Sequence, residues 1–363
     1  MSEWMERTWG DVITLQRGYD ITKNEQVLSG TVPVVSSGGI SSHHDTSISD
    51  GPGVVMGRKG TLGRVHYIEG AYWPHDTTLW VRDFKGNHPR FVYYALKAMD
   101  TVFLNVGSAS PTLNRNHVHP QSVLWPNGVG EQRAIAEVLG ALDDKIAAND
   151  LLVACADSLA RVVTVAAIND EAVPLSQTAT ITMGSSPPGT SYNESGEGTV
   201  FYQGVRDFGV RSPRNRVWTT EPVRLAAAGD TLVSVRAPVG RTNLASESLC
   251  LGRGLAGVRA KDGRQATLFH LLRSVDSVWT PFEAEGTIFG AINKAQLESV
   301  SIPCVRNDQR DHLEEQLAGL EGRIAAALSE TVVLAATRDS LLALLMSGKV
   351  RVKDAEKLVG GAV

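Results

Sequence analysis

Apolar side chains recur at alternating spacings of four and three residues in two long stretches of the chain, one from Ile135 and one from Leu313. This spacing is typical of a helix that buries one stripe along its length. The stripes, or seams, comprise Ile135, Leu139, Leu142 and Ile146 in the first stretch and Leu313, Leu317, Leu320 and Ile324 in the second. Because matched seams let two helices bury their stripes against each other, the pattern predicts an antiparallel coiled coil. Two independent helices, each lying on its own domain, are the alternative.

The duplication extends from the helices into the sequence that precedes each of them. One match places VVMGRKGTLGR (54–64) over LVSVRAPVGR (232–241) with one residue deleted, and Pro126 falls on Pro303. A near-constant offset across half a chain indicates two copies of one unit. In each copy, short β-rich runs alternate with Gly, Pro, Ser and Asn clusters and with short helices, which predicts an α+β domain.

These patterns divide the chain into five segments. We expect β-rich domains at 1–126 and 169–303, spacer helices at 127–168 and 304–350, and a C-terminal tail at 351–363. From Ile135 to Val163 the first helix would rise about 42 Å at ~1.5 Å per residue. Two domains held at opposite ends of such a helix pair, related by a pseudo-twofold axis, would suit successive major grooves of DNA, which repeat every ~34–36 Å.

Composition sets broad limits on function. Of the 363 residues, 42% are hydrophobic, which is ample for packed cores, and the three isolated cysteines fit a reducing compartment. No apolar run is long enough to cross a membrane, and the first residues lack the apolar core of a signal peptide, so we expect a cytoplasmic protein. The net charge of −4 gives no simple argument for nucleic-acid binding. Any phosphate-binding surface must come from the arrangement of basic groups.

Several loose motifs follow one another in a specific order. They are WGDVITLQRG near the start, RKGTLG and SVRAPVG in the two copies, WPNGVGEQRAIAEVL where the first helix begins, and LLALLMSGKVRV near the end. With these motifs the chain resembles, over nearly all of its length, the specificity subunit (HsdS) of type I restriction-modification systems. It departs from the pattern at Asp308, where the first copy has Glu131, and in lacking a second counterpart of HHD (43–45).

The resemblance implies two tandem α/β target-recognition domains, separated by the two long helices. A subunit of this family binds a bipartite, asymmetric site in double-stranded DNA, and each domain reads one half. Its helices fix the spacing and dock two modification subunits, which use S-adenosylmethionine to methylate adenine. In systems that also cleave DNA, a restriction subunit adds activity that depends on ATP and Mg²⁺. No cofactor is expected in this chain itself.

Clusters of basic side chains are the candidate DNA contacts. The clearest is YQGVRDFGVRSPRNRVW (202–218), because arginine forks suit phosphate and guanine, although a solvated basic loop is the alternative. The turns that contain RKGTLG and RAPVG, and the polar segment NRNH (114–117), are weaker candidates that could equally be ordinary turns. The candidate residues are Arg58, Lys59, Arg64, Asn114, Arg115, Arg206, Arg211, Arg214, Arg216, Arg236 and Arg241.

The chain lacks the motifs of a self-sufficient methyltransferase. Its Pro-Pro pair stands in SPPG (186–189), unlike (D/N)PP(Y/F), and its glycine-rich turn is neither GxGxxG nor a P-loop. His43-His44-Asp45 and His75-Asp76 have no third ligand at a suitable spacing, which favours solvated histidines over a metal site. We therefore expect no catalytic and no metal-binding residues. A two-domain coiled-coil adaptor that binds only proteins is the other hypothesis left open.

Overall fold

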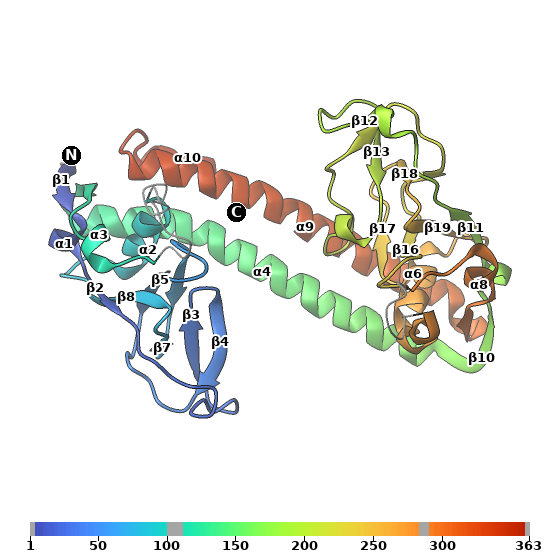
Figure 1. Cartoon of the computed structure of the whole chain (residues 1–363), viewed down its shortest axis with the longest axis horizontal. Helices are drawn as coiled ribbons and strands as arrows, with labels where there is room; N and C mark the ends of the chain where they lie inside the picture. The colour runs from blue at the N-terminus through green and yellow to red at the C-terminus, as the bar shows by residue number, and fades with distance from the viewer. Residues whose placement is uncertain (1–3, 100–111, 283–289, 360–363) are drawn as a thin grey trace. The chain divides into compact units, whose positions relative to one another are not determined.

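The computed structural model describes residues 4–99, 112–282 and 290–359 and divides the chain into two compact units. Unit 1 comprises residues 1–148 and 330–363, and unit 2 comprises residues 149–329. Both long helices are shared between the units. Helix α4 (Val129–Ala167) begins in unit 1 and ends in unit 2, whereas α9 (Arg310–Met346) begins in unit 2 and ends in unit 1 (Figure 1). The predicted α+β class is confirmed: two β-rich domains accompany two long helices that pack together.

Unit 1 contains three small sheets and several short helices around the long ones. A 2-stranded sheet pairs β1 with β9, a 4-stranded sheet has the order β2-β8-β5-β6, and a 3-stranded sheet has the order β4-β3-β7. The strands are β1 (Trp4–Thr8), β2 (Thr14–Arg17), β3 (Val32–Ser36), β4 (Gly39–His44), β5 (Gly53–Gly57), β6 (Val65–Ile68), β7 (Trp73–Pro74), β8 (Thr78–Asp83) and β9 (Ser122–Pro126). The short helices are α1 (Trp9–Val12), α2 (Pro89–Lys97), α3 (Arg115–Val118) and α10 (Val352–Val359).

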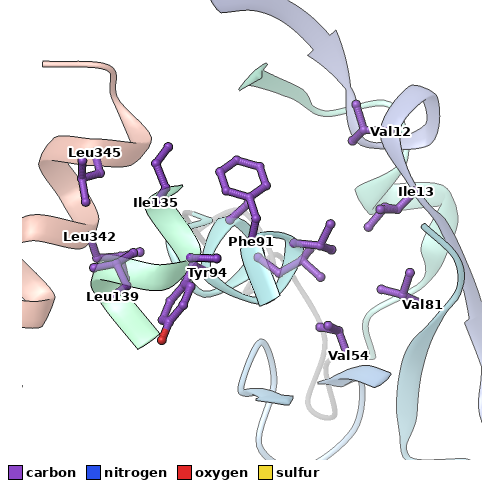
Figure 2. Packing of buried hydrophobic residues seen from close by; sticks show 14 of the residues in the cluster. Val12, Ile13, Val54, Val81, Phe91, Tyr94, Ile135, Leu139, Leu342 and Leu345 are labelled. Carbon is purple, nitrogen blue, oxygen red and sulfur yellow. The ribbon is translucent and has the colours of Figure 1, made fainter. Parts of the chain in front are cut away.

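The core of unit 1 lies around α2. This helix packs against the long helices on one side and against the four-stranded sheet on the other, and its buried residues are apolar on both sides. Phe91 and Tyr94 are fully buried, and they lie between the leucines of the long helices and the valines of the four-stranded sheet (Figure 2). On the helix side the contacts include Leu139 and Leu342, and on the sheet side they include Val54. This layer therefore attaches the β-rich domain to the helix pair through burial of apolar surface.

Unit 2 repeats this plan with a larger third sheet, which has five strands where unit 1 has three. A 2-stranded sheet pairs β10 with β20, a 4-stranded sheet has the order β11-β19-β16-β17, and a 5-stranded sheet has the order β12-β14-β13-β18-β15. The strands are β10 (Ile168–Pro174), β11 (Ala179–Met183), β12 (Tyr192–Asn193), β13 (Thr199–Tyr202), β14 (Trp218–Thr219), β15 (Leu225–Ala226), β16 (Thr231–Ser234), β17 (Thr242–Leu244), β18 (Leu249–Leu251), β19 (Leu255–Ala260) and β20 (Ser301–Val305). The α-helices are α5 (Leu175–Thr178), α6 (Gln265–Ser274), α7 (Asp276–Trp279) and α8 (Lys294–Ser299), and the 3-10 turns are η2 (Gly189–Ser191), η3 (Val205–Asp207), η4 (Thr280–Phe282) and η5 (Asn307–Gln309).

The seam residues lie where the two long helices meet. In unit 1, Asp143 accepts from Arg338 at 2.7 Å and Lys145 lies 3.6 Å from Glu330, so residue numbers fall along α9 as they rise along α4. The helices are therefore antiparallel in this unit. The seam residues Ile135, Leu139, Leu142, Leu313, Leu317 and Ile324 are buried, and Ile146 and Leu320 are partly buried against the same clusters.

Strand pairing shows that the two β-rich domains are copies of one unit. In the first copy Val54 pairs with Tyr67, and in the second Thr231 pairs with Leu244, with every following pair in step. The turns that follow β5 and β16 therefore have equal lengths. The one-residue deletion placed there by sequence matching is wrong, and Lys59 is the structural counterpart of Arg236.

The end of each copy shows a second shift in register. Trp9 N donates to Gln121 O at 3.1 Å in the first copy, and Leu175 N donates to Val300 O at 2.8 Å in the second. Ser122 and Ser301 therefore occupy equivalent places at the start of β9 and β20. Pro126 is the last residue of β9, whereas Pro303 is the middle residue of β20, so the match of the two prolines is displaced by two residues.

The segment predicted as a tail contains the helix α10. Ala355 of this helix is fully buried in the core of unit 1, and Val352 is partly buried against it. The last residues, 360–363, lie outside the described part of the chain. The functional division at residues 126, 168, 303 and 350 stays a prediction.

Candidate nucleic-acid interface

The turn after β5 carries three of the candidate basic residues in unit 1. Gly57 N donates to Arg64 O at 2.8 Å, and Gly63 N donates to Gly57 O at 3.0 Å, which closes the turn. Lys59 and Arg64 are exposed on it. Arg58 is held differently, because its guanidinium donates to Leu113 O at 3.3 Å and to a second backbone carbonyl. Arg58 therefore organises the turn, while Lys59 and Arg64 present their charged groups to solvent.

One carboxylate gathers the basic groups beside this turn. Asp76 Oδ2 accepts from Arg17 Nη2 at 3.0 Å and lies 3.7 Å from Lys59 Nζ. His75 Nδ1 lies 3.1 Å from Asp76 Oδ1. Since Arg17 and Lys59 share this one carboxylate, the three groups together carry a net positive charge.

The turn after β16 has the same hydrogen bonds in unit 2. Ser234 N donates to Arg241 O at 2.8 Å, and Gly240 N donates to Ser234 O at 3.0 Å. Gly240 has a φ of +81°, and a Cβ added there would lie 2.2 Å from the ring of Trp279. Only glycine fits at this position. The turn exposes Arg236 and Arg241 to solvent.

The arginine-rich segment 203–218, called the arginine loop, lies against this second turn. Arg206, Arg216 and Arg236 line one cavity of about 690 Å³. Asp207 is buried there, and its carboxylate accepts from Gln203 N at 2.9 Å and from Arg216 Nη2 at 3.0 Å. Arg216 is thus held in one orientation while its side chain stays 44% exposed. A guanidinium fixed in this way suits two-point recognition of phosphate or guanine.

Arg214 and the aromatic residues of the loop have separate roles. Arg214 N donates to Asp207 O at 2.8 Å, while its side chain is exposed. Tyr202, the last residue of β13 directly before the loop, is buried, and Phe208 and Trp218 of the loop are partly buried against the same apolar cluster. The aromatic rings therefore support the loop from below, which leaves Arg206, Arg214 and Arg216 as its accessible cations.

Arg211 requires a correction to the candidate set. It is 7% exposed and lies 2.8 Å from both Asp157 of α4 and Glu321 of α9, with its guanidinium 5.2 Å from the ring centroid of Phe269. A cation that is buried and enclosed by two carboxylates and an aromatic ring is used within the fold and is not accessible to DNA. We therefore assign Arg211 to the attachment of the arginine loop to the long helices.

The same attachment includes α6. Arg273 Nη2 donates to Asp157 Oδ2 at 3.0 Å, and His270 Nε2 lies 2.9 Å from Glu321 Oε1. The hydrogen bond from Arg273, with the nearby charge of Arg211, lowers the pKa of Asp157 to about 2. Unit 1 has a related polar contact, in which Tyr94 Oη donates to Asp143 at 2.7 Å. Burial of its phenol raises the pKa of Tyr94, so it remains a donor at neutral pH.

Asn114 and Arg115 stand beside the turn of unit 1. Asn114 Oδ1 accepts from Asn116 N at 3.1 Å and caps α3, and Arg115 is exposed. The backbone joins this cap to the turn, because Leu113 N donates to Arg58 O at 2.9 Å. The Asn114 amide is therefore partly used by the fold, whereas the Arg115 guanidinium is accessible.

Sequence matching missed the counterparts of this pair in unit 2. Asn293 Oδ1 accepts from Gln296 N at 2.9 Å and caps α8, and Ile292 N donates to Val235 O at 2.9 Å. Asn293 and Lys294 thus occupy the places of Asn114 and Arg115. Direct comparison of the tripeptides Leu-Asn-Arg and Ile-Asn-Lys would have found them, but the register chosen from the prolines hid the match.

The histidines of unit 1 form no cluster with other metal ligands. His44 Nδ1 lies 3.4 Å from Asp45, and in residues 4–99, 112–282 and 290–359 no group of three His, Cys, Asp or Glu side chains could hold a metal ion. None of the helices in this part of the chain is both long and apolar enough to cross a membrane.

Comparisons with known proteins agree with the sequence motifs and with the fold. Residues 1–151 match the model of the type I restriction modification DNA specificity domain. A specificity subunit of the type I restriction enzyme MjaX from Methanocaldococcus jannaschii is 35% identical over 174 residues, which are 48% of this chain and 41% of that protein. The match thus spans less than half of that relative's length.

A solved structure extends the likeness to the whole fold. The S subunit of a type I restriction-modification system from M. genitalium superposes with a TM-score of 0.70 and 15% identity, and the match covers 95% of this chain and 96% of that one. At this identity the likeness concerns the fold alone. Residues 1–151 are therefore similar in sequence to the type I restriction modification DNA specificity domain. The chain as a whole is similar in fold to an S subunit of a type I restriction-modification system.

Proposed function

We propose that this chain is the non-catalytic subunit that selects the DNA target of a type I restriction-modification enzyme. The observation that carries the proposal is the duplicated β-rich domain, which in each copy exposes basic side chains on the same closed turn. Each copy would read one half of a bipartite, asymmetric site in double-stranded DNA. Because the two copies differ in their other loops, the two halves of the site would differ as well.

The long helices are proposed to set the spacing and to bind the catalytic partners. Part of α4 in unit 2 leaves large apolar side chains in solvent, namely Leu151, Leu152, Leu159, Val162 and Val165. Apolar groups gathered on one exposed helix mark a surface for a protein partner. We propose that two modification subunits dock on the helices and use S-adenosylmethionine to methylate adenine. A restriction subunit that uses ATP and Mg²⁺ would join in systems that also cleave DNA.

Methylation mapping tests the proposal directly. The chain is expressed together with a modification subunit, and the methylated positions of the host DNA are read by methylation-sensitive sequencing. We expect methylated adenines in a motif of two short halves separated by a fixed gap. The matched control expresses the modification subunit alone, which should methylate no such motif. Equal methylation with and without this chain would contradict the proposed function.

A protein-binding adaptor is the competing function, and salt dependence separates the two. A protein that neutralises phosphates releases counterions, so its DNA affinity falls steeply as salt rises. The adaptor hypothesis predicts no DNA affinity at any salt concentration. Fluorescence anisotropy with a labelled duplex distinguishes these outcomes.

A further inference from the structure

The two basic turns are equivalent residue by residue. The turn of Gly57–Arg64 and the turn of Ser234–Arg241, called the matched turns, are closed by the same two backbone hydrogen bonds. The strands on either side keep the same register, since Met56 pairs with Val65 where Val233 pairs with Thr242. Each turn presents a cation at two equivalent positions.

These two positions are basic in both copies, and the side chains are exposed. Lys59 corresponds to Arg236, and Arg64 corresponds to Arg241; all four are exposed. The neighbouring position is different, because Arg58 corresponds to Val235, whose side chain is buried. The two positions at which both turns carry a positive charge are therefore both exposed to solvent.

The arginine loop has no basic counterpart in the first copy. The strand before it, β13, pairs parallel to β18 through Phe201 and Cys250, as β3 pairs with β7 through Val34 and Trp73. The segment that follows β3 corresponds to the arginine loop, and it reads SGGISSHHDTSISDGP (37–52). It contains neither Lys nor Arg. The loops therefore differ in charge where the turns agree.

We infer that Lys59, Arg64, Arg236 and Arg241 of the matched turns bind backbone phosphates without regard to sequence, whereas Arg206, Arg214 and Arg216 give the second copy its base preference. Two domains that read different half-sites share the sugar-phosphate backbone but not the bases. Side chains present in both copies at one place can recognise only what both half-sites have in common. Contacts to phosphate fix position, and contacts to base edges specify sequence.

This inference rests on the proposed DNA-binding function and says which basic side chains contact phosphate and which contact bases. Arg236 lines the same cavity as Arg206 and Arg216. A phosphate contact and the base-reading side chains would therefore be adjacent in unit 2. In unit 1, Lys59 lies 3.7 Å from Asp76, a distance that leaves its ammonium available to a stronger anionic partner.

Salt-dependent binding of the full chain, assembled with its modification subunits, tests the assignment. The probes are a duplex that contains the methylated motif and a duplex of the same composition with that motif shuffled. One variant is Arg236→Ala with Arg241→Ala, and its matched control is Lys353→Ala with Lys357→Ala, which removes the same charge from the exposed face of α10. Thermal melting of each protein verifies that it is folded.

We expect the Arg236/Arg241 variant to lose affinity for both duplexes by the same factor. Each lost phosphate contact should reduce the slope of log affinity against log salt by ~0.9, so the loss of affinity between 50 and 200 mM salt should shrink by roughly tenfold. The ratio of affinities for the two duplexes should stay as in the wild type. The control variant should change neither the slope nor the ratio by more than a small fraction of this.

The unmatched loop should behave in the opposite way. Arg206→Ala and Arg214→Ala should lower the ratio between the motif and the shuffled duplex by about 5–150-fold for a contact that reads a base. The inference is overturned if the Arg236/Arg241 variant keeps the wild-type slope or if it loses discrimination. Wild-type protein that binds neither duplex at any salt concentration would instead overturn the proposed function itself.

Discussion

Truncation of Leu142 tests whether the seam stabilises the protein. Leu142 of α4 is fully buried in the core of unit 1, together with Leu139 and the leucines of α9. Leu142→Ala removes three carbon groups from this core, and at ~0.8 kcal/mol each their transfer to water accounts for about 2.4 kcal/mol. The space left behind adds ~1–2 kcal/mol because neighbouring helices relax only partly. We expect a loss of about 3–4 kcal/mol in the free energy of unfolding of unit 1.

Leu151→Ala is the matched control because it makes the same change on the same helix. Leu151 is 66% exposed, so it loses only a minor part of the transfer term and leaves no enclosed space. Its expected cost is below ~1 kcal/mol. Urea unfolding followed by circular dichroism measures both variants, and the midpoint should fall for Leu142→Ala without a change in slope.

The comparison of the two variants decides whether Leu142 lies in a packed interface. Thermal melting should place Leu142→Ala about 10 °C below the wild type, since ~2–4 °C is lost per kcal/mol for a unit of this size. Equal stability of the two variants would mean that Leu142 does not lie in a packed interface, and the helix pairing derived from the seam would be refuted. A changed slope would point to a different unfolded or native state instead.

Three further predictions concern the units. Asp157→Asn should remove part of the pH dependence of stability. The pKa of Asp157 is lowered to about 2 from 3.8, so its contribution to the free energy of unfolding is full above pH ~4 and is lost as pH falls toward 2; after allowance for its partial exposure it amounts to about 1 kcal/mol. Acid titration of unfolding in both proteins shows whether the variant lacks this pH dependence. Gly240→Ala should lower the free energy of unfolding measured by calorimetry by more than ~2 kcal/mol. Gly229 has a similar positive φ but no atom near an added Cβ, so Gly229→Ala should lower it by about 1 kcal/mol. Equal losses would show that the contact with Trp279 is unimportant. Replacing residues 169–303 by the second domain of another family member should change one half of the methylated motif, and a change in both halves would contradict independent reading.

The positions of the long helices could be predicted because a helix repeats its burial pattern locally. The seam at Ile135, Leu139 and Leu142 is visible in the sequence since every third or fourth residue faces the same partner. The duplication was visible for the same reason, because each copy keeps its own local pattern. These features determined the α+β class and the pairing of the helices without any knowledge of long-range contacts.

The residue-by-residue correspondence between the two β-rich domains was set by backbone hydrogen bonds between distant residues, and a local sequence pattern does not reveal such bonds. The match of Lys59 with Arg236 depends on strand pairing between residues far apart in the chain, and gaps in a short alignment can be placed at several points at equal cost. The backbone bonds of Leu113 and Ile292 decided which asparagines correspond. The pair Asn293-Lys294 was missed for this reason.

The role of each arginine was decided by tertiary structure alone. Arg206 and Arg211 look alike in the sequence, and both stand in a polar loop rich in glycine. Arg211 became a structural residue because Glu321, far along the chain, brings a carboxylate within 2.8 Å of it, while Arg206 is exposed beside a cavity. Periodicity determines which faces of an element are buried, because it is a local property of the chain. Whether a charged group meets a partner or solvent depends on long-range packing, which only the folded structure reveals.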